Sequence, residues 1–155
     1  MKTILTALLI VFSISSLHAK PSLRQKASDV INNKNVVVID ITVKEAYKDG
    51  SIKINLNKAL KGSFKVDIVK TVIWGCIGRE ASGYLKSGKR YVLIARGTDS
   101  LFCEAIWEVV KDEKGNLNVN YSNIFMDEPN APFPKKQGSV SLKKITECVE
   151  KVTKS

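Results

Sequence analysis

The chain has 155 residues, and its 25 lysines and arginines exceed its 15 aspartates and glutamates, which gives a formal net charge of +10 at pH 7. This length allows one domain with a sizeable hydrophobic core. A basic protein outside the cell usually meets acidic glycans, anionic surfaces or acidic protein partners rather than nucleic acid, although the charge can also serve only to keep the protein soluble.

The first nineteen residues have the pattern of a secretory signal peptide. Lys2 is their only charge, an apolar run extends from Ile4 to Phe12, and Ala19 is a small residue at the predicted cleavage point. The apolar run is too short for a membrane-spanning helix. We therefore expect a secreted, extracellular product without a membrane span, in preference to a protein held by an N-terminal anchor.

The only histidine, His18, is removed with this predicted signal peptide. The mature chain, 20–155, then lacks the usual general base at neutral pH and the commonest metal ligand. Three widely spaced cysteines without histidine do not form a closed zinc site. We therefore predict no catalytic residue, no metal and no cofactor, and do not expect an enzyme.

The first elements of the mature chain are a helix and a hairpin. Apolar residues at helical spacing predict a short helix over residues 22–31. A run rich in β-branched residues predicts a strand over 36–43. The pair Asp49-Gly50 predicts a turn, and the alternation of apolar and polar residues over 52–57 predicts a second strand with one face in solvent.

Three more strands are expected, at 64–74, 90–96 and 101–110. The pattern over 121–126 is ambiguous, and 127–134 is a proline-rich segment that favours a rigid surface connection over a strand or a peptide ligand. One apolar stripe at helical spacing predicts an amphipathic helix over about 139–152, with Cys148 beside the stripe.

The order of these elements indicates the fold class. Strands precede the long helix instead of alternating with helices, which argues for a mainly β barrel or sandwich with appended helices. We expect a single domain over 20–155, with its barrel at about 36–126 and the terminal helix lying across the barrel.

The chain has three cysteines, Cys76, Cys103 and Cys148. The secretory route is oxidising, so we expect disulfide bonding rather than reactive thiols. An odd number leaves one cysteine buried, free or bonded to another molecule.

The cysteines belong to a longer pattern that resembles a known family. The pattern consists of Cys76, a Leu85-x-x-Gly88-x-x-Tyr91 segment that continues to Ala95, Cys103-x-x-x-Trp107 and Cys148 in a terminal helix, with Lys58-Ala-Leu-Lys-Gly62 before it and Ile145-Thr-Glu-Cys-Val-Glu150 at its end. It resembles the netrin-like (NTR) module over about residues 36–150. That module occurs in tissue inhibitors of metalloproteinases and at the C-terminus of netrins and complement proteins, with a related form at the N-terminus of agrin.

This resemblance implies a five-stranded OB-fold barrel with helices packed on it. Tissue inhibitors use an N-terminal Cys-x-Cys pair to chelate the protease zinc, whereas the mature chain here begins Lys20-Pro21 and has no cysteine before Cys76. The resemblance makes inhibition of metalloproteinases the alternative function, and the missing N-terminal cysteine pair argues against it. The missing pair implies that Cys76 and Cys103 bond to each other and that Cys148 is unpaired or intermolecular; the main alternative is a bond from one of them to Cys148.

Several exposed groups are candidates for ligand contact. Converging cations can hold a sulfated glycan, although lysines on strand edges also deter aggregation. Asn120 begins a glycosylation sequon. Trp74 and Trp107 could stack on a ligand, but core packing is the favoured interpretation. The predicted glycan-binding residues are Lys58, Lys61, Lys65, Lys70, Lys86, Lys89 and Arg90.

Together these features predict a secreted, non-enzymatic, netrin-like binding module. Its expected setting is the extracellular matrix, a biomineral matrix or a secretion, and its expected partner is a sulfated glycan or a protein. We expect a monomer or a dimer linked through Cys148.

Overall fold

The computed structural model describes residues 27–49, 51–73, 84–97, 100–121 and 138–154. The predicted signal peptide, Trp74, Cys76 and the proline-rich segment lie outside these residues. The elements in chain order are α1 (Ala27–Asn32), β1 (Val36–Ala46), β2 (Ser51–Lys61), β3 (Ile68–Ile73), β4 (Arg90–Arg96), β5 (Ser100–Lys111), β6 (Leu117–Tyr121), β7 (Gly138–Ser141) and α2 (Leu142–Thr153).

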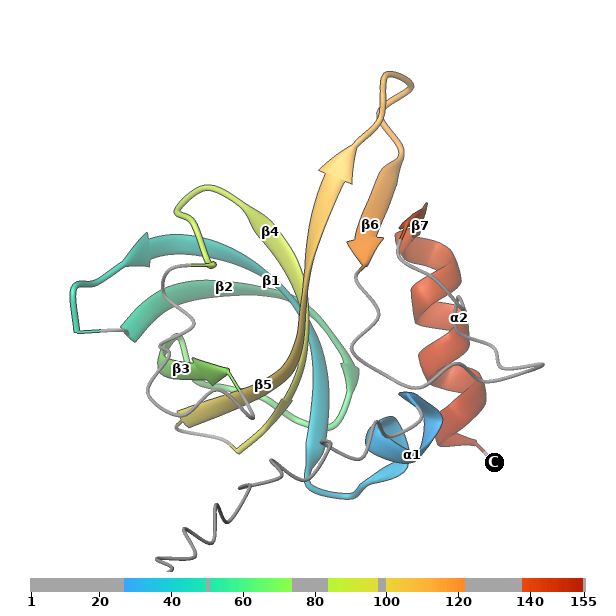
Figure 1. The fold of residues 1–155 in the computed structure, drawn as a ribbon, viewed down its shortest axis with the longest axis horizontal. Helices are drawn as coiled ribbons and strands as arrows, with labels where there is room; N and C mark the ends of the chain where they lie inside the picture. Colours follow the sequence, from blue (N-terminus) through green and yellow to red (C-terminus); the bar gives the residue numbers. More distant parts are fainter. Residues whose placement is uncertain (1–26, 50, 74–83, 98–99, 122–137, 155) are drawn as a thin grey trace, which may run out of the picture.

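The strands form one mainly antiparallel sheet in the order β3-β2-β1-β4-β5-β6-β7, and β3 also pairs with β5. This extra pairing is parallel, with Ile73 opposite Cys103, and it closes β1 to β5 into a ring of five strands. Strands β6 and β7 extend the sheet beyond the ring on the side of β5 (Figure 1).

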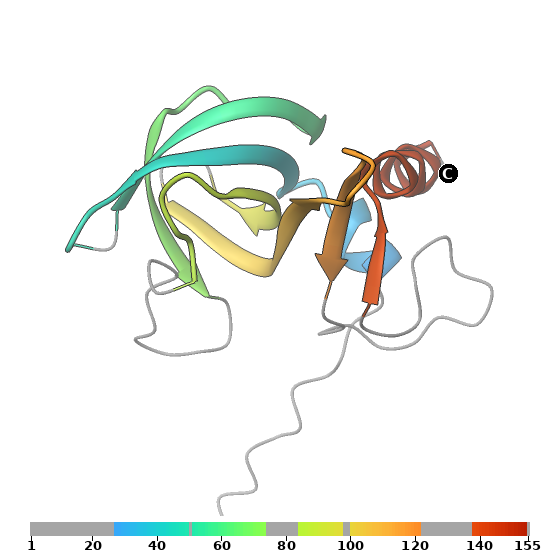
Figure 2. The same ribbon diagram turned by 90° about the horizontal axis from the view of Figure 1, so that it is seen from above.

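The helices lie together at one end of the molecule. Figure 1 shows α2 beside β6 and β7 and α1 beside α2 and β1, whereas the tip of the β1–β2 hairpin points to the opposite end (Figures 1 and 2). The helices therefore cover only part of the outer surface of the ring. The described helices leave the rest of the outer face of β1 and β2 uncovered, and there polar side chains take their place.

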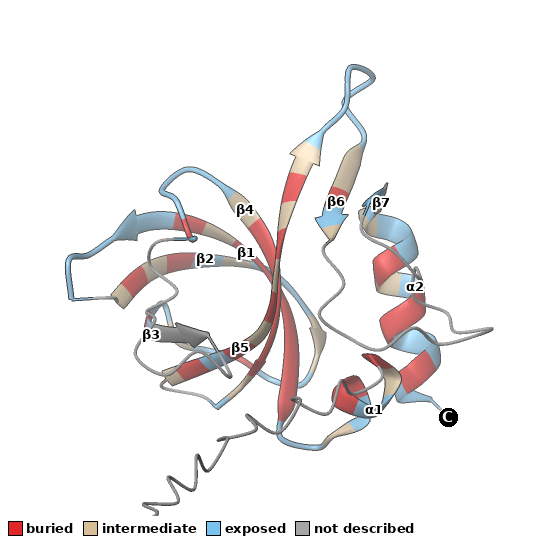
Figure 3. Ribbon diagram, viewed as in Figure 1, coloured by how far each residue is buried: buried red, intermediate tan, exposed pale blue. Residues whose placement is uncertain are grey.

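The sheet separates two hydrophobic cores. The inner core lies inside the ring and includes Ile39, Leu93 and Cys103. The outer core lies between the outer face of the ring and the helices, and it includes Ile94 and Trp107. Because successive residues of a strand point to opposite faces, β1, β4 and β5 contribute to both cores (Figure 3).

A bulge in β5 sets which of its residues reach each core. Ile94 pairs with Ala105 and Ala95 with Cys103, so Glu104 is the extra residue on the β5 side. Before it Cys103 faces the inner core, and after it Trp107 faces the outer core although both positions are odd-numbered. The bulge exchanges the two faces of β5 where the strand leaves the ring.

Most predicted strands are confirmed with longer or shifted ends. The strand predicted at 90–96 has the bounds of β4, and the strand predicted at 64–74 begins only at Ile68 as β3. Phe64, before it, is nevertheless buried in the inner core. The described part of the predicted N-terminal helix is α1, which ends at Asn32.

The prediction for the C-terminal segment needs one correction. Residues 139–141 are not helical but belong to β7, where Val140 pairs with Val119 of β6. The helix begins at Leu142 because the Ser141 side chain accepts a hydrogen bond from Lys144 N and caps it. The predicted apolar stripe is confirmed: Ile145, Val149 and Val152 are buried in the outer core.

Candidate functional site

The described residues do not form a metal centre. Within them, no three His, Cys, Asp or Glu side chains come together in a way that could hold a metal ion. The helices among these residues are also too short or too polar to cross a membrane. The groups with chemical interest are therefore surface cations, one buried ion pair and two buried thiols.

The predicted glycan-binding residues lie in several parts of the ring. Lys58 is on β2, Lys65 follows β2, Lys70 is on β3, and all three are exposed. Lys86 and Lys89 are exposed in the turn before β4. Backbone hydrogen bonds hold this turn against β1, with Gly88 N donating to the Val43 carbonyl at 2.8 Å and Val43 N donating to the Lys89 carbonyl at 2.9 Å.

Lys61 is engaged inside the fold. Its half-buried ammonium group donates to the carbonyls of Ile31 and of Asn33, the latter at 2.6 Å. These carbonyls lie at the C-terminal end of α1, where orphan acceptors and the helix dipole favour a cation. Partial burial lowers the pKa of Lys61. The ammonium group therefore fastens β2 to α1 and is not directed at a ligand.

Arg90 is engaged in the same way. Its Nε lies 2.8 Å from Asp40 Oδ1 and its Nη2 lies 2.6 Å from Asp40 Oδ2, which makes a two-point ion pair. The hydrogen bond with Asp40 raises the pKa of Arg90. Asp40 is only 2% exposed, so this guanidinium neutralises a buried carboxylate.

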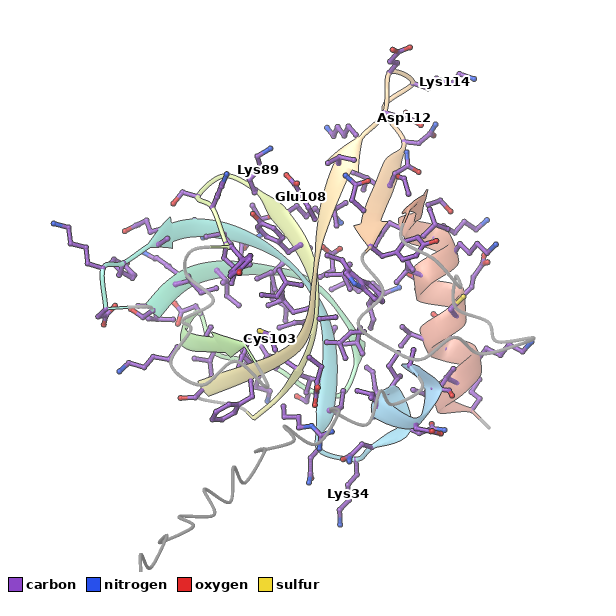
Figure 4. All side chains as sticks on the ribbon, in the orientation of Figure 1. Lys34, Lys89, Cys103, Glu108, Asp112 and Lys114 are labelled. Atoms are coloured by element: carbon purple, nitrogen blue, oxygen red, sulfur yellow. The ribbon has the colours of Figure 1, made fainter. Side chains whose placement is uncertain are left out.

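The remaining cations differ in their neighbours. Lys89 Nζ lies 3.0 Å from Glu108 Oε1, a surface ion pair that Figure 4 shows at the upper end of the ring. Within the described ranges, the exposed side chains of Lys58, Lys65, Lys70 and Lys86 form no salt bridge. These four lysines therefore carry charge that a polyanion can use.

A row of polar side chains lies beside the buried ion pair. Asn57 Nδ2 donates to Asp40 Oδ1 at 3.1 Å and to Thr42 Oγ1 at 3.0 Å. Asn55 Nδ2 in turn approaches Asn57 Oδ1 at 3.4 Å. We call the hydroxyl side chain of Thr42 and the amide side chains of Asn55 and Asn57 together the amide row.

Sequence reasoning missed the amide row and the ion pair beneath it. One signal was available, because Asp40 is a single charge inside a β-branched run, and a buried carboxylate needs a cationic partner. The sequence did not identify that partner, because Asp40 and Arg90 meet only when β1 pairs with β4.

The two described cysteines lie in different cores. Cys103 is 1% exposed in the inner core, where burial raises the pKa of its thiol to about 12. Cys148 lies on the buried side of α2 in the outer core, and burial raises the pKa of its thiol as well. Because the sheet separates the two cores, a Cys103–Cys148 bond would require the fold to rearrange.

Trp107 is a core residue, as the favoured interpretation predicted. It is 4% exposed, and its ring meets Tyr121 edge to face with centroids 6.2 Å apart. Its indole Nε1 is buried without a hydrogen-bond partner in the described structure. Stacking on a surface ligand is therefore not available to Trp107.

Asn120 is exposed and is the last residue but one of β6. Its backbone lies between Glu108 of β5 and Ser139 of β7. The sequon asparagine therefore faces solvent, as a glycan attachment site requires, and its use stays a prediction.

Comparison with known proteins finds no relative of this chain. No protein-family model matches the chain, and searches of curated proteins and of solved structures give no significant match.

Proposed function

We propose that the chain is a secreted, non-enzymatic binding module of netrin-like type that holds sulfated glycans, in an extracellular or biomineral matrix. The observation that carries the proposal is the set of four exposed lysines without a salt bridge, Lys58, Lys65, Lys70 and Lys86, on a chain of net charge +10. Several such cations can act together on a polyanion.

We further propose that the ring is an OB-fold barrel, as the resemblance to the netrin-like module implies. Two observations support this assignment: five strands close into a ring, and a terminal helix packs on the outer face. OB-fold proteins bind oligosaccharides on the face of their second and third strands. Lys58 and Lys70 lie on these two strands.

The glycan proposal is tested by chromatography of the mature protein on heparin resin. We expect retention at low salt and elution with added salt, because lysine side chains that bind a polyanion release its counterions, and added salt opposes this release. Changing the four lysines to glutamine should lower the eluting salt concentration strongly. A matched control carries the same four charge losses elsewhere, at Lys34, Lys111, Lys114 and Lys144, all exposed.

The two variants separate a site from net charge. The control should elute close to the unaltered protein if the four lysines form the binding surface. Passage of the unaltered protein through the resin at low salt would remove the proposal, and equal losses in both variants would reduce it to an effect of net charge.

A further inference from the structure

The outer face of β1 and β2 combines neutral hydrogen-bonding groups with cations. The side chains of the amide row, Thr42, Asn55 and Asn57, are hydrogen-bonded to one another on this face. We infer that the amide row reads the sugar hydroxyl groups of a glycan whose sulfates are held by neighbouring lysines. This inference rests on the proposed function and assigns selectivity for saccharide over other polyanions.

A hydrogen bond to the buried carboxylate of Asp40 fixes the orientation of the Asn57 amide. Asp40 Oδ1 accepts from both Arg90 Nε and Asn57 Nδ2, at 2.8 and 3.1 Å. A carboxylate only accepts hydrogen bonds, so the NH₂ group of Asn57 must point at Asp40 and its carbonyl oxygen must point toward Asn55. Asp40 and Arg90 are thus positioning residues for an exposed side chain.

Asn55 has hydrogen-bonding capacity left over. The one hydrogen bond of its side chain in the described structure is the 3.4 Å contact from Nδ2 to Asn57 Oδ1, which is long for this kind of bond. One N–H and the carbonyl oxygen of this exposed side chain are then available to a ligand. A sugar hydroxyl both donates and accepts, so it can use both groups.

This dual capacity distinguishes a glycan from an inorganic polyanion. Ionised phosphate oxygens accept hydrogen bonds but do not donate them, so the carbonyl oxygen of Asn55 is of no use to polyphosphate. Lysine ammonium groups, in contrast, serve sulfate and phosphate alike as point charges. The two parts of the surface therefore make separable predictions.

Cations bracket the row along β2. Lys53 precedes Asn55, and its contact with Glu45 is an exposed ion pair of 3.6 Å that a ligand anion can replace. Lys58 follows Asn57 and is exposed opposite Asp40, whose charge Arg90 already neutralises. Five strand residues span about 16 Å, so the two cations and the amides between them fit an extended polyanionic chain. This charge complementarity is the reason to assign a sulfated glycan.

The test compares two ligands by calorimetry: a heparin oligosaccharide of defined length and inorganic polyphosphate of similar charge. Changing Asn55 to alanine should weaken heparin binding about fivefold, the equivalent of one lost hydrogen bond, and should weaken polyphosphate binding less, because polyphosphate can use only the N–H group of Asn55. Thr42→Val should act in the same direction. Asn35→Ala, also an exposed asparagine, is the matched control and should change neither affinity.

The outcomes distinguish this inference from the function on which it rests. Equal weakening of both ligands by Asn55→Ala, or no change in heparin affinity, would overturn the role of the amide row. Lys58→Gln should weaken both ligands. If neither ligand binds the unaltered protein, the glycan-binding function itself fails.

Discussion

Asp40 is the only charged residue in the described structure that is almost fully buried, and its energetics depend on Arg90. An isolated carboxylate is costly to remove from water, whereas a carboxylate with two hydrogen bonds to a guanidinium is tolerated. The ion pair of Asp40 and Arg90 is not expected to stabilise the protein strongly. Each protects the fold from the cost of leaving the other alone.

This argument predicts an asymmetry between single and double substitutions. Arg90→Met should lower the free energy of unfolding by about 3–5 kcal/mol, because it leaves a buried unpaired carboxylate. Adding Asp40→Leu to that variant should restore much of the loss. Urea denaturation of the variants measures the difference; a double variant that is less stable than Arg90→Met would show that the pair is itself strongly favourable.

The sequence identifies which residues are cationic, but not which of these cations are used inside the fold. A sequence shows that Lys61 and Lys58 are both cationic, but not that one of them ends beside the carbonyls of α1. That contact joins residues 28 positions apart and exists only after α1 has packed on the sheet. The candidate lysines could be named from sequence, and the subset available to a ligand could not.

At the scale of elements, β2 stabilises α1, because a side chain of β2 supplies hydrogen bonds that the end of α1 lacks. Helix α1 has only six residues, too few to be stable alone in water. Its apolar residues pack into the outer core, and the ammonium group of Lys61 satisfies carbonyls at its end. The helix therefore depends on the sheet for its stability.

Lys61 and Lys58 should separate stability from binding. Lys61→Met should lower the free energy of unfolding by about 2 kcal/mol, since it removes charge-assisted hydrogen bonds, and should leave heparin elution nearly unchanged. Lys58→Met should do the reverse. Thermal denaturation and heparin chromatography measure the two effects; a large drop in heparin retention with Lys61→Met would return Lys61 to the ligand surface.

Strands were predictable where their residues carried a strong local pattern. The runs that became β1 and β4 are rich in β-branched and apolar residues, and both were found. Strand β6 contains asparagines at 118 and 120, and β7 contains two serines and a glycine, so neither has high β-propensity. Their pairing with each other and with β5 makes them strands, and that tertiary cause is not visible in local sequence.

At the scale of the whole molecule, two cores share the same strands. Residues of β1, β4 and β5 line the inner core with one face and the outer core with the other. Loss of packing on one side therefore disturbs the strands that the other side needs. The molecule should behave as one cooperative unit and not as a ring with a separate helical layer.

Conservative truncations in each core test this cooperativity. Ile39→Val in the inner core and Ile94→Val in the outer core should each cost about 1 kcal/mol and shift one common transition. Unfolding should be followed by far-UV circular dichroism and by tryptophan fluorescence. Transitions that separate in either variant would show that the cores unfold independently.

The proposed Cys76–Cys103 disulfide is also a prediction about the whole chain. Ile73, at the end of β3, lies opposite Cys103, and Cys76 follows three residues later. Three residues span at most about 10 Å, so the chain between Ile73 and Cys76 is short enough to keep this pairing possible. A peptide map of the unreduced protein should contain this pair, and a Cys148 bridge within the same chain would contradict it.

The parallel pairing of β3 with β5 also has a kinetic consequence. The antiparallel pairs β1–β2, β2–β3, β4–β5 and β5–β6 each join strands that are consecutive in the chain and can form early, but the pairs β1–β4 and β3–β5 join segments distant in the chain. Such pairings require a long loop to be closed before any contact rewards it, which slows folding. The sheet is thus expected to assemble from two units of consecutive strands, β1–β2–β3 and β4–β5–β6, and the pairing of β1 with β4 and of β3 with β5 is the slow step that closes the ring.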